Sequence, residues 1–230
     1  MSSGIFVTAT GTDVGKTYIT ARLIKALRSK GINAGYYKAA LSGAVLEGGK
    51  RIAGDAACVY RFAGLKGDSN QAVTTILDYP ASPHLAAQLE DKSITLPPIL
   101  RDFGKAASIY DYVVMEGSGG IICPLNLGES PLMLTDVIKT LALDIVIVAD
   151  AGLGTINSTL LTFEYARNLK IETRCIVLNR FDASSVIHQD NKKVLEAVTG
   201  RRVLVCNDHG DMDASSIKKI LGKDFTHKFT

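Results

Sequence analysis

A run of small and polar residues near the N-terminus, TATGTDVGKT at positions 8–17, has the residue types that bind a polyphosphate. It follows an apolar segment at residues 5–7 and precedes a helical pattern that begins at Tyr18. A strand that turns through glycines into a helix points several backbone N–H groups and the positive end of the helix dipole at one spot. In such a loop Lys16 would reach the β and γ phosphates of a nucleotide, and the Thr17 hydroxyl would ligate the accompanying Mg²⁺.

The spacing within this loop departs from the common phosphate-loop motif. The motif G-x-x-x-x-G-K-[ST] has a glycine five residues before Gly15, where this sequence has Thr10, flanked by Ala9 and Gly11. The alternative interpretation is a glycine-containing turn that binds nothing. We favour phosphate binding because Gly-Lys-Thr falls where a strand becomes a helix, which is the context that the motif requires.

Three more charged residues fall where a parallel sheet collects its ligands. Lys38 follows the strand-like segment 34–37, Asp55 opens an expected helix, and Glu116 ends a continuous apolar run. Because ligands bind at the carboxyl ends of parallel strands, we expect these side chains to meet Lys16 in space.

Together these groups suit Mg²⁺-dependent phosphoryl transfer. Two carboxylates and the Thr17 hydroxyl are hard-oxygen ligands for Mg²⁺, and two lysines would neutralise charge on a transferring phosphoryl group. Each residue alone has a simpler explanation: Asp55 would cap a helix, Lys38 would be a surface charge, and Glu116 would be a solvated acid. Their joint occurrence after a phosphate loop favours the functional interpretation, because independent surface charges have no reason to fall at successive strand exits.

The elements that must position these residues alternate along the chain between strand-like and helix-like patterns. We expect a single α/β domain over residues 1–230, a doubly wound, mainly parallel sheet with helices on both faces. The expected strands cover residues 5–7, 34–37, 112–115, 145–150, 175–179 and 203–205. The expected helices cover residues 18–30, 55–63, 83–90, 97–108, 134–141, 154–168, 191–198 and 215–221.

Composition excludes several other classes of protein. The formal charge of +3 over 230 residues is small and the basic residues are scattered, so we expect neither a nucleic-acid nor a membrane partner. The sequence shows neither a signal-peptide pattern nor an apolar run of membrane-spanning length, which predicts a cytoplasmic protein. The four cysteines form no C-x-x-C pair and are expected to be small buried thiols, and the histidines lack metal-ligand spacing.

Beyond these general patterns, the sequence resembles the dethiobiotin synthetases. The resemblance covers most of the first 160 residues, in the order that the family has them. It rests on the loop GTDVGKT at 11–17, GYYK at 35–38, Ser42-Gly43, Asp55, Ser82-Pro83-His84, EGSGG at 116–120 and GLGTIN at 152–157. The phosphate loop alone is shared by very many nucleotide-binding proteins, whereas the combination is far more specific.

The resemblance implies a homodimeric enzyme of biotin synthesis that depends on ATP and Mg²⁺. Such an enzyme closes the ureido ring of dethiobiotin from 7,8-diaminononanoate (7,8-diaminopelargonate) and CO2. The diamine is carboxylated to a carbamate, the γ-phosphoryl group of ATP is transferred to the carbamate, and the second amine displaces phosphate to close the ring.

The resemblance also implies a role for each matching residue. Catalysis would involve Lys38, Lys16 and Thr12, and Thr17, Asp55 and Glu116 would hold Mg²⁺. The nucleotide would contact Asp13, Val14, Gly15, Lys16, Thr17, Tyr18 and Glu116, with Asn179 reading the adenine base. The diamine or its carbamate would contact Thr12, Lys38, Ser42, Ser82 and Pro83. The turn of Gly154, Thr155, Ile156 and Asn157 would bind the distal carboxylate of the substrate across the dimer interface.

Two positions and one segment depart from the family's usual pattern. Ala9 replaces a glycine and fits only if its backbone keeps φ negative, and Ala39 replaces a proline. The usual base-bordering segment near the C-terminus is replaced by residues 205–210. A regulatory ATPase that positions chromosomes or division sites is the alternative, but the loop lacks the lysine that such proteins carry before Lys16.

Overall fold

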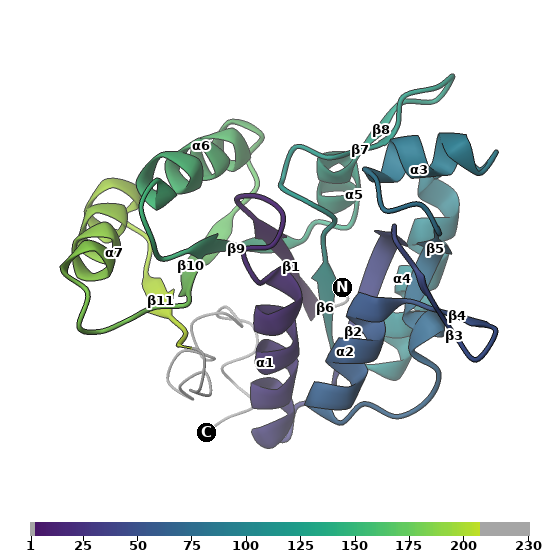
Figure 1. The fold of residues 1–230 in the computed structure, drawn as a ribbon, viewed down its shortest axis with the longest axis horizontal. Coiled ribbons are helices and arrows are strands. Elements are labelled where there is room, and N and C mark those ends of the chain that lie inside the picture. The colour runs from purple at the N-terminus through teal and green to yellow at the C-terminus, as the bar shows by residue number, and fades with distance from the viewer. Residues whose placement is uncertain (1–2, 208–230) are drawn as a thin grey trace.

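Among the residues that the structure describes, seven parallel strands form one sheet through the middle of the molecule (Figure 1). The structure is a computed structural model and describes residues 3–207. The strands lie in the order β11-β10-β9-β1-β6-β2-β5, and every neighbouring pair is parallel. Their bounds are β1 Ser3–Ala9, β2 Ala34–Leu41, β5 Val73–Ile76, β6 Tyr112–Glu116, β9 Asp144–Asp150, β10 Thr173–Asn179 and β11 Val203–Val205. The predicted doubly wound α/β fold is confirmed.

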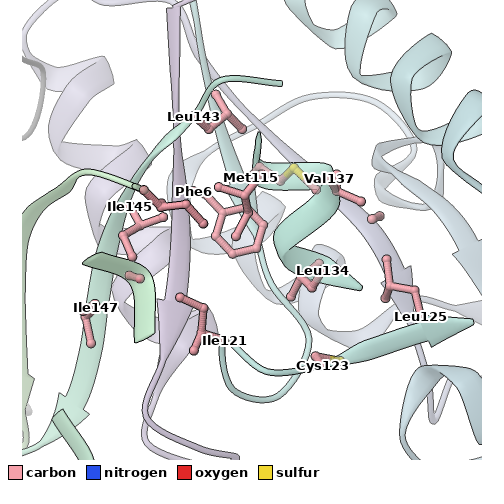
Figure 2. Close-up of a cluster of buried hydrophobic side chains, with 14 of the residues drawn as sticks. Phe6, Met115, Ile121, Cys123, Leu125, Leu134, Val137, Leu143, Ile145 and Ile147 are labelled. Carbon is pink, nitrogen blue, oxygen red and sulfur yellow. The ribbon is translucent and has the colours of Figure 1, made fainter. Parts of the chain in front are cut away.

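Helices cover both faces of this sheet, and the sheet divides the core into two halves. Side chains alternate along β1, so that Ile5 and Val7 pack with α1 and α2 while Phe6 packs on the opposite face with α5. Figure 2 shows the Phe6 ring beside Met115 and Leu134 in that second half. The helices are α1 Lys16–Ser29, α2 Gly54–Ala63, α3 Pro83–Leu89, α4 Leu96–Ile109, α5 Leu134–Thr140, α6 Thr155–Asn168 and α7 Val186–Thr199, with the 3-10 helix η1 at Ser69–Ala72.

The chain directly after Glu116 passes close to the Phe6 ring of this core. Phe6 and Met115 pair in register between β1 and β6, and the Phe6 ring lies against the backbone of Gly117. A Cβ atom at Gly117 would stand 2.8 Å from that ring, so only glycine fits directly after the acid. The sheet therefore delivers Glu116 to the carboxyl edge immediately before the chain turns away.

The sequence analysis missed several short strands. β5 is a four-residue edge strand with the sequence VTTI, too short to show an alternating pattern. Two antiparallel hairpins lie outside the main sheet: β3 Val45–Glu47 with β4 Lys50–Ile52, and β7 Pro124–Asn126 with β8 Leu132–Met133. β3 and β4 are largely exposed and lack the buried face that makes a strand visible in a sequence.

Some predicted details also need correction. Strand β2 continues to Leu41 instead of ending at residue 37, so Lys38 lies inside the strand and not directly after its end. Helix α7 begins at Val186 rather than near 191, because the Ser185 side chain caps it by accepting a hydrogen bond from the backbone N–H of His188 at 3.3 Å. Cys58 is exposed, whereas Cys123, Cys175 and Cys206 are buried as predicted. The helix predicted at 215–221 lies outside the described residues. Over 3–207 no helix combines the length and apolar character that crossing a bilayer requires.

Candidate functional site

The predicted phosphate loop connects β1 to α1 at the carboxyl edge of the sheet (Figure 1). Gly15 precedes the helix with φ of 92° and no side chain caps it, so the first N–H groups of α1 stay available. A Cβ atom at Gly15 would stand 2.0 Å from Nδ2 of Asn179, and this amide donates a hydrogen bond to the carbonyl of Val14 at 3.0 Å. Both the positive φ and this contact require glycine.

Four side chains converge beside this loop and form a charge cluster, in which Lys38 and Glu116 are buried and Asp55 is partly exposed. The Lys38 ammonium lies 2.6 Å from Oδ2 of Asp55 and 3.0 Å from Oε1 of Glu116. The Thr17 hydroxyl donates to the same Oε1 at 2.8 Å. The structure therefore brings together Thr17, Lys38, Asp55 and Glu116, which the sequence places on four separate elements.

Burial and charge act against each other within this cluster. Burial acts to lower the pKa of Lys38, but the Glu116 and Asp55 carboxylates outweigh it and raise the pKa above its usual value. Burial likewise acts to raise the pKa of Asp55, and Lys38 outweighs it and lowers that pKa. For Lys16 burial prevails and lowers the pKa. Lys38 and Asp55 are thus a charged pair at neutral pH.

A pocket of about 640 Å³ opens in front of these groups. Its lining includes predicted nucleotide, metal and substrate residues: Thr12, Asp13, Gly15, Lys16, Thr17, Tyr18, Lys38, Ser42, Asp55 and Glu116. Thr17, Asp55 and Glu116 supply hydroxyl and carboxylate oxygens, which suit Mg²⁺. Within 3–207 no three His, Cys, Asp or Glu side chains gather as a metal site, so Mg²⁺ would take its other ligands from phosphates and water.

Other predicted residues lie away from this pocket. Ser82 and Pro83 begin α3 and do not line the pocket, although the nearby Pro80 packs against Gly43. Gly154, Thr155, Ile156 and Asn157 begin α6 and also lie outside the lining. Asn179 is buried behind the phosphate loop, where its Oδ1 has no hydrogen-bond partner. One chain alone therefore does not unite all the predicted substrate contacts.

The sequence analysis did not identify Arg180, Ser118 or Cys58, which also line the pocket. Arg180 has φ of 55°, donates to the carbonyl of Asp13 at 2.8 Å and pairs with Asp150 at 2.7 Å. The sequence could have indicated Arg180 as a site residue, because it directly follows Asn179 at the end of a strand. Ser118 donates to the carbonyl of Ala40 at 2.7 Å, and nothing in its spacing indicated this contact.

Two of the three departures from the resembled pattern are accommodated by the fold. Ala9 is the last residue of β1 and is fully buried. Its φ is not positive, which is the condition under which an alanine fits at this position. Ala39 lies inside β2, buried among the side chains on the α4 face. In the third segment, residues 208–210 lie outside the described part of the chain. Ala9 and Ala39 therefore leave the loop and the strand intact.

Comparison with known proteins decides the family. The protein-family model described as an AAA domain matches residues 3–207. The ATP-dependent dethiobiotin synthetase BioD of Clostridium botulinum strain Langeland is 48% identical over 96% of this chain and 97% of its own. That of strain 657 is 49% identical over 92% of this chain and 93% of its own. The chain belongs to the dethiobiotin synthetase family.

A solved structure supports the fold independently. A plasmid partition protein from Borrelia burgdorferi is similar over 99% of both chains, with a TM-score of 0.57 and 15% sequence identity. At this identity the likeness concerns the fold alone. This chain and the partition protein thus share the overall arrangement of the sheet and its helices.

Proposed function

We propose that this chain catalyses ATP-dependent closure of the ureido ring of dethiobiotin from 7,8-diaminononanoate and CO2. The observation that carries the proposal is the Lys38 ammonium held between Asp55 and Glu116 at the phosphate loop. A carbamate and a transferring phosphoryl group are both anionic, and a fixed ammonium stabilises the charge that develops between them. Family membership supports this substrate class.

The residues of this chain would divide the reaction between them. Lys16 and the N–H groups that begin α1 would bind the β and γ phosphates, and Lys38 would orient the carbamate oxygen that attacks the γ phosphorus. Ser42 and Thr12 line the same pocket and would contact the carbamate. Thr17, Asp55 and Glu116 would hold Mg²⁺, which neutralises phosphate charge when bound.

We also propose a homodimer in which the start of α6 completes the partner's site. Asn157 in the first turn of α6 is exposed, and so is Leu153, two residues before the helix begins, so both side chains are accessible to a partner. The N–H groups at a helix start suit a carboxylate, and Gly154 leaves those of α6 without a side-chain cap. The cytoplasmic location and the single domain over 1–230 stay predictions.

The test of the reaction is an ADP-release assay in which each substrate is omitted in turn. ADP release should require both 7,8-diaminononanoate and bicarbonate, because the phosphoryl acceptor does not exist without them. Mass spectrometry of the product should show dethiobiotin. Turnover stimulated instead by DNA, lipid or a protein partner would contradict the proposal and favour the regulatory ATPase, which shares the fold.

The shared site has a test of its own. Asn157→Ala should raise the KM for the diamine more than the KM for ATP. A mixture of Asn157→Ala and Lys38→Ala should regain activity, because one of the two sites in a mixed dimer is then intact. No recovery after verified subunit exchange would contradict a site formed by two subunits.

A further inference from the structure

The Tyr36 side chain contacts the charge cluster from inside the protein. It projects from β2 on the same face as Lys38, two residues further on, and is 1% exposed. Its hydroxyl donates a hydrogen bond to Oε2 of Glu116 at 3.0 Å. Glu116 is itself 1% exposed, so this contact is sealed from solvent.

The two oxygens of Glu116 consequently have different partners. Oε1 accepts from Thr17 at 2.8 Å and from Lys38 at 3.0 Å, and both donors line the phosphate-loop pocket. Oε2 accepts from Tyr36 alone among the hydrogen bonds of residues 3–207. One oxygen is therefore directed to the pocket and the other is held in the interior.

We propose that Tyr36 is a positioning residue that orients the Glu116 carboxylate, so that Oε1 stays presented to Mg²⁺, Thr17 and Lys38. The inference rests on the proposed function for its metal and its nucleotide. The terminal torsion of a glutamate is soft, so the carboxylate keeps one orientation only where hydrogen bonds hold it. A hydrogen bond to a buried carboxylate is charge-assisted and strong enough to do so.

Removing the Tyr36 hydroxyl would leave Oε2 buried without a donor. The carboxylate would then rotate toward Thr17 and Lys38 with both oxygens, and the oxygen position that the metal needs would no longer be fixed. Outer-shell partners of metal ligands commonly change metal affinity or activity by about 10–100-fold when they are lost. We therefore expect Tyr36 to affect function although it does not line the phosphate-loop pocket.

Tyr37 provides a matched control on the same strand. It is also 1% exposed, but its side chain lies on the opposite face of the sheet. Its hydroxyl donates to the carbonyl of Ile99 at 3.0 Å and shares a hydrogen bond with Thr74 at 2.7 Å. Tyr37→Phe therefore removes a buried hydroxyl of the same kind without touching Glu116.

The first experiment measures Mn²⁺ binding to the ADP complex by electron paramagnetic resonance, a readout that needs no turnover. Tyr36→Phe should weaken Mn²⁺ binding about tenfold, within the range for lost outer-shell partners. Tyr37→Phe should leave it unchanged while lowering the midpoint of thermal unfolding. Equal metal affinities in the two variants would overturn the proposal. So would a Tyr36→Phe protein that unfolds while Tyr37→Phe stays folded, because the hydroxyl would then be purely structural.

The second experiment is a double-mutant cycle with Glu116→Gln. If Tyr36 acts through Glu116, Tyr36→Phe should lower the rate of ADP release clearly in the unmodified enzyme and by less than twofold in Glu116→Gln. Fully additive effects would overturn the proposal. Failure of the unmodified enzyme to respond to diamine and bicarbonate would contradict the proposed function instead, and the Mn²⁺ comparison would still decide the role of Tyr36.

Discussion

The two sides of the phosphate-loop pocket are built differently. On the side of β2 and β6, Lys38 and Glu116 are charged groups at most 3% exposed, and they contact each other. On the side of β10, the buried group is the neutral amide of Asn179, and the charged Arg180 is exposed in its pair with Asp150.

This difference gives the two sides different roles: the β2 and β6 side faces the charge of a transferring phosphoryl group, and the β10 side holds the phosphate loop in place. Interactions between charges are stronger where water is excluded, so the β2 and β6 side is suited to stabilising a phosphoryl group in transfer. On the β10 side, Asn179 and Arg180 each donate to a loop carbonyl, that of Val14 at 3.0 Å and that of Asp13 at 2.8 Å. We therefore expect mutations on the first side to change the rate, and mutations on the second to change nucleotide affinity.

The largest effect is expected from Lys38→Ala. The rate of ADP release should fall by about 10² or more, since a positioned charge that acts on the transition state contributes a few kcal/mol. The variant should also unfold at a lower temperature, because Glu116 would lose a buried charge partner. Steady-state kinetics and calorimetry measure the two effects separately.

Two further lysine variants serve as a comparison and a control for this prediction. Lys16→Ala should damage ATP binding as well as the rate, because Lys16 would contact the phosphates in the ground state. Lys192→Ala, which removes a surface lysine paired with Glu196 at 3.0 Å, should change neither stability nor rate appreciably. Equal, small losses of rate in Lys38→Ala and Lys16→Ala would show that Lys38 has no role in the active site. They would also contradict the proposed difference between the two sides of the pocket.

A smaller effect is expected from Asn179→Ala. The KM values for ATP and GTP should both rise, because the loop loses the amide that holds Val14. If this amide also reads adenine, the unmodified enzyme should prefer ATP by roughly tenfold, since one polar contact contributes on the order of 1–2 kcal/mol, and the variant should lose that preference. A preference for ATP that survives the substitution would show that another segment reads the base.

The smallest effect concerns Asp150. Burial acts to raise its pKa, but the backbone N–H of Gly152 and the Arg180 guanidinium together lower it below 3.8. Because the folded pKa is depressed, this pair stabilises the fold above the unfolded pKa and stops doing so as the pH falls through the folded value. Arg180→Ala should raise the pKa of Asp150 part of the way back, as measured by an NMR titration. An unchanged pKa would mean that Gly152 and His188, and not Arg180, lower it.

Strong local patterns allowed the central elements to be predicted from sequence. β6 and β9 are continuous apolar runs buried on both faces, and Pro83 and Pro97 mark helix starts that the structure confirms. β5 and the hairpins escaped prediction because they are short, lie at an edge or outside the main sheet, and are stabilised by their neighbours rather than by their own residues. Cys58 was misjudged because burial depends on which helix face meets the core.

The sequence by itself determined the phosphate loop, the alternation of strands and helices, and the residue types of the candidate site. These are local properties: glycine conformation, hydrophobic period and the chemistry of individual side chains. Only the tertiary structure decided which oxygen of Glu116 meets Lys38 and which meets Tyr36, and that Arg180 holds the loop at Asp13. Those contacts join residues about 80 to 170 positions apart, and sequence spacing contains no information on the strand order that brings them together.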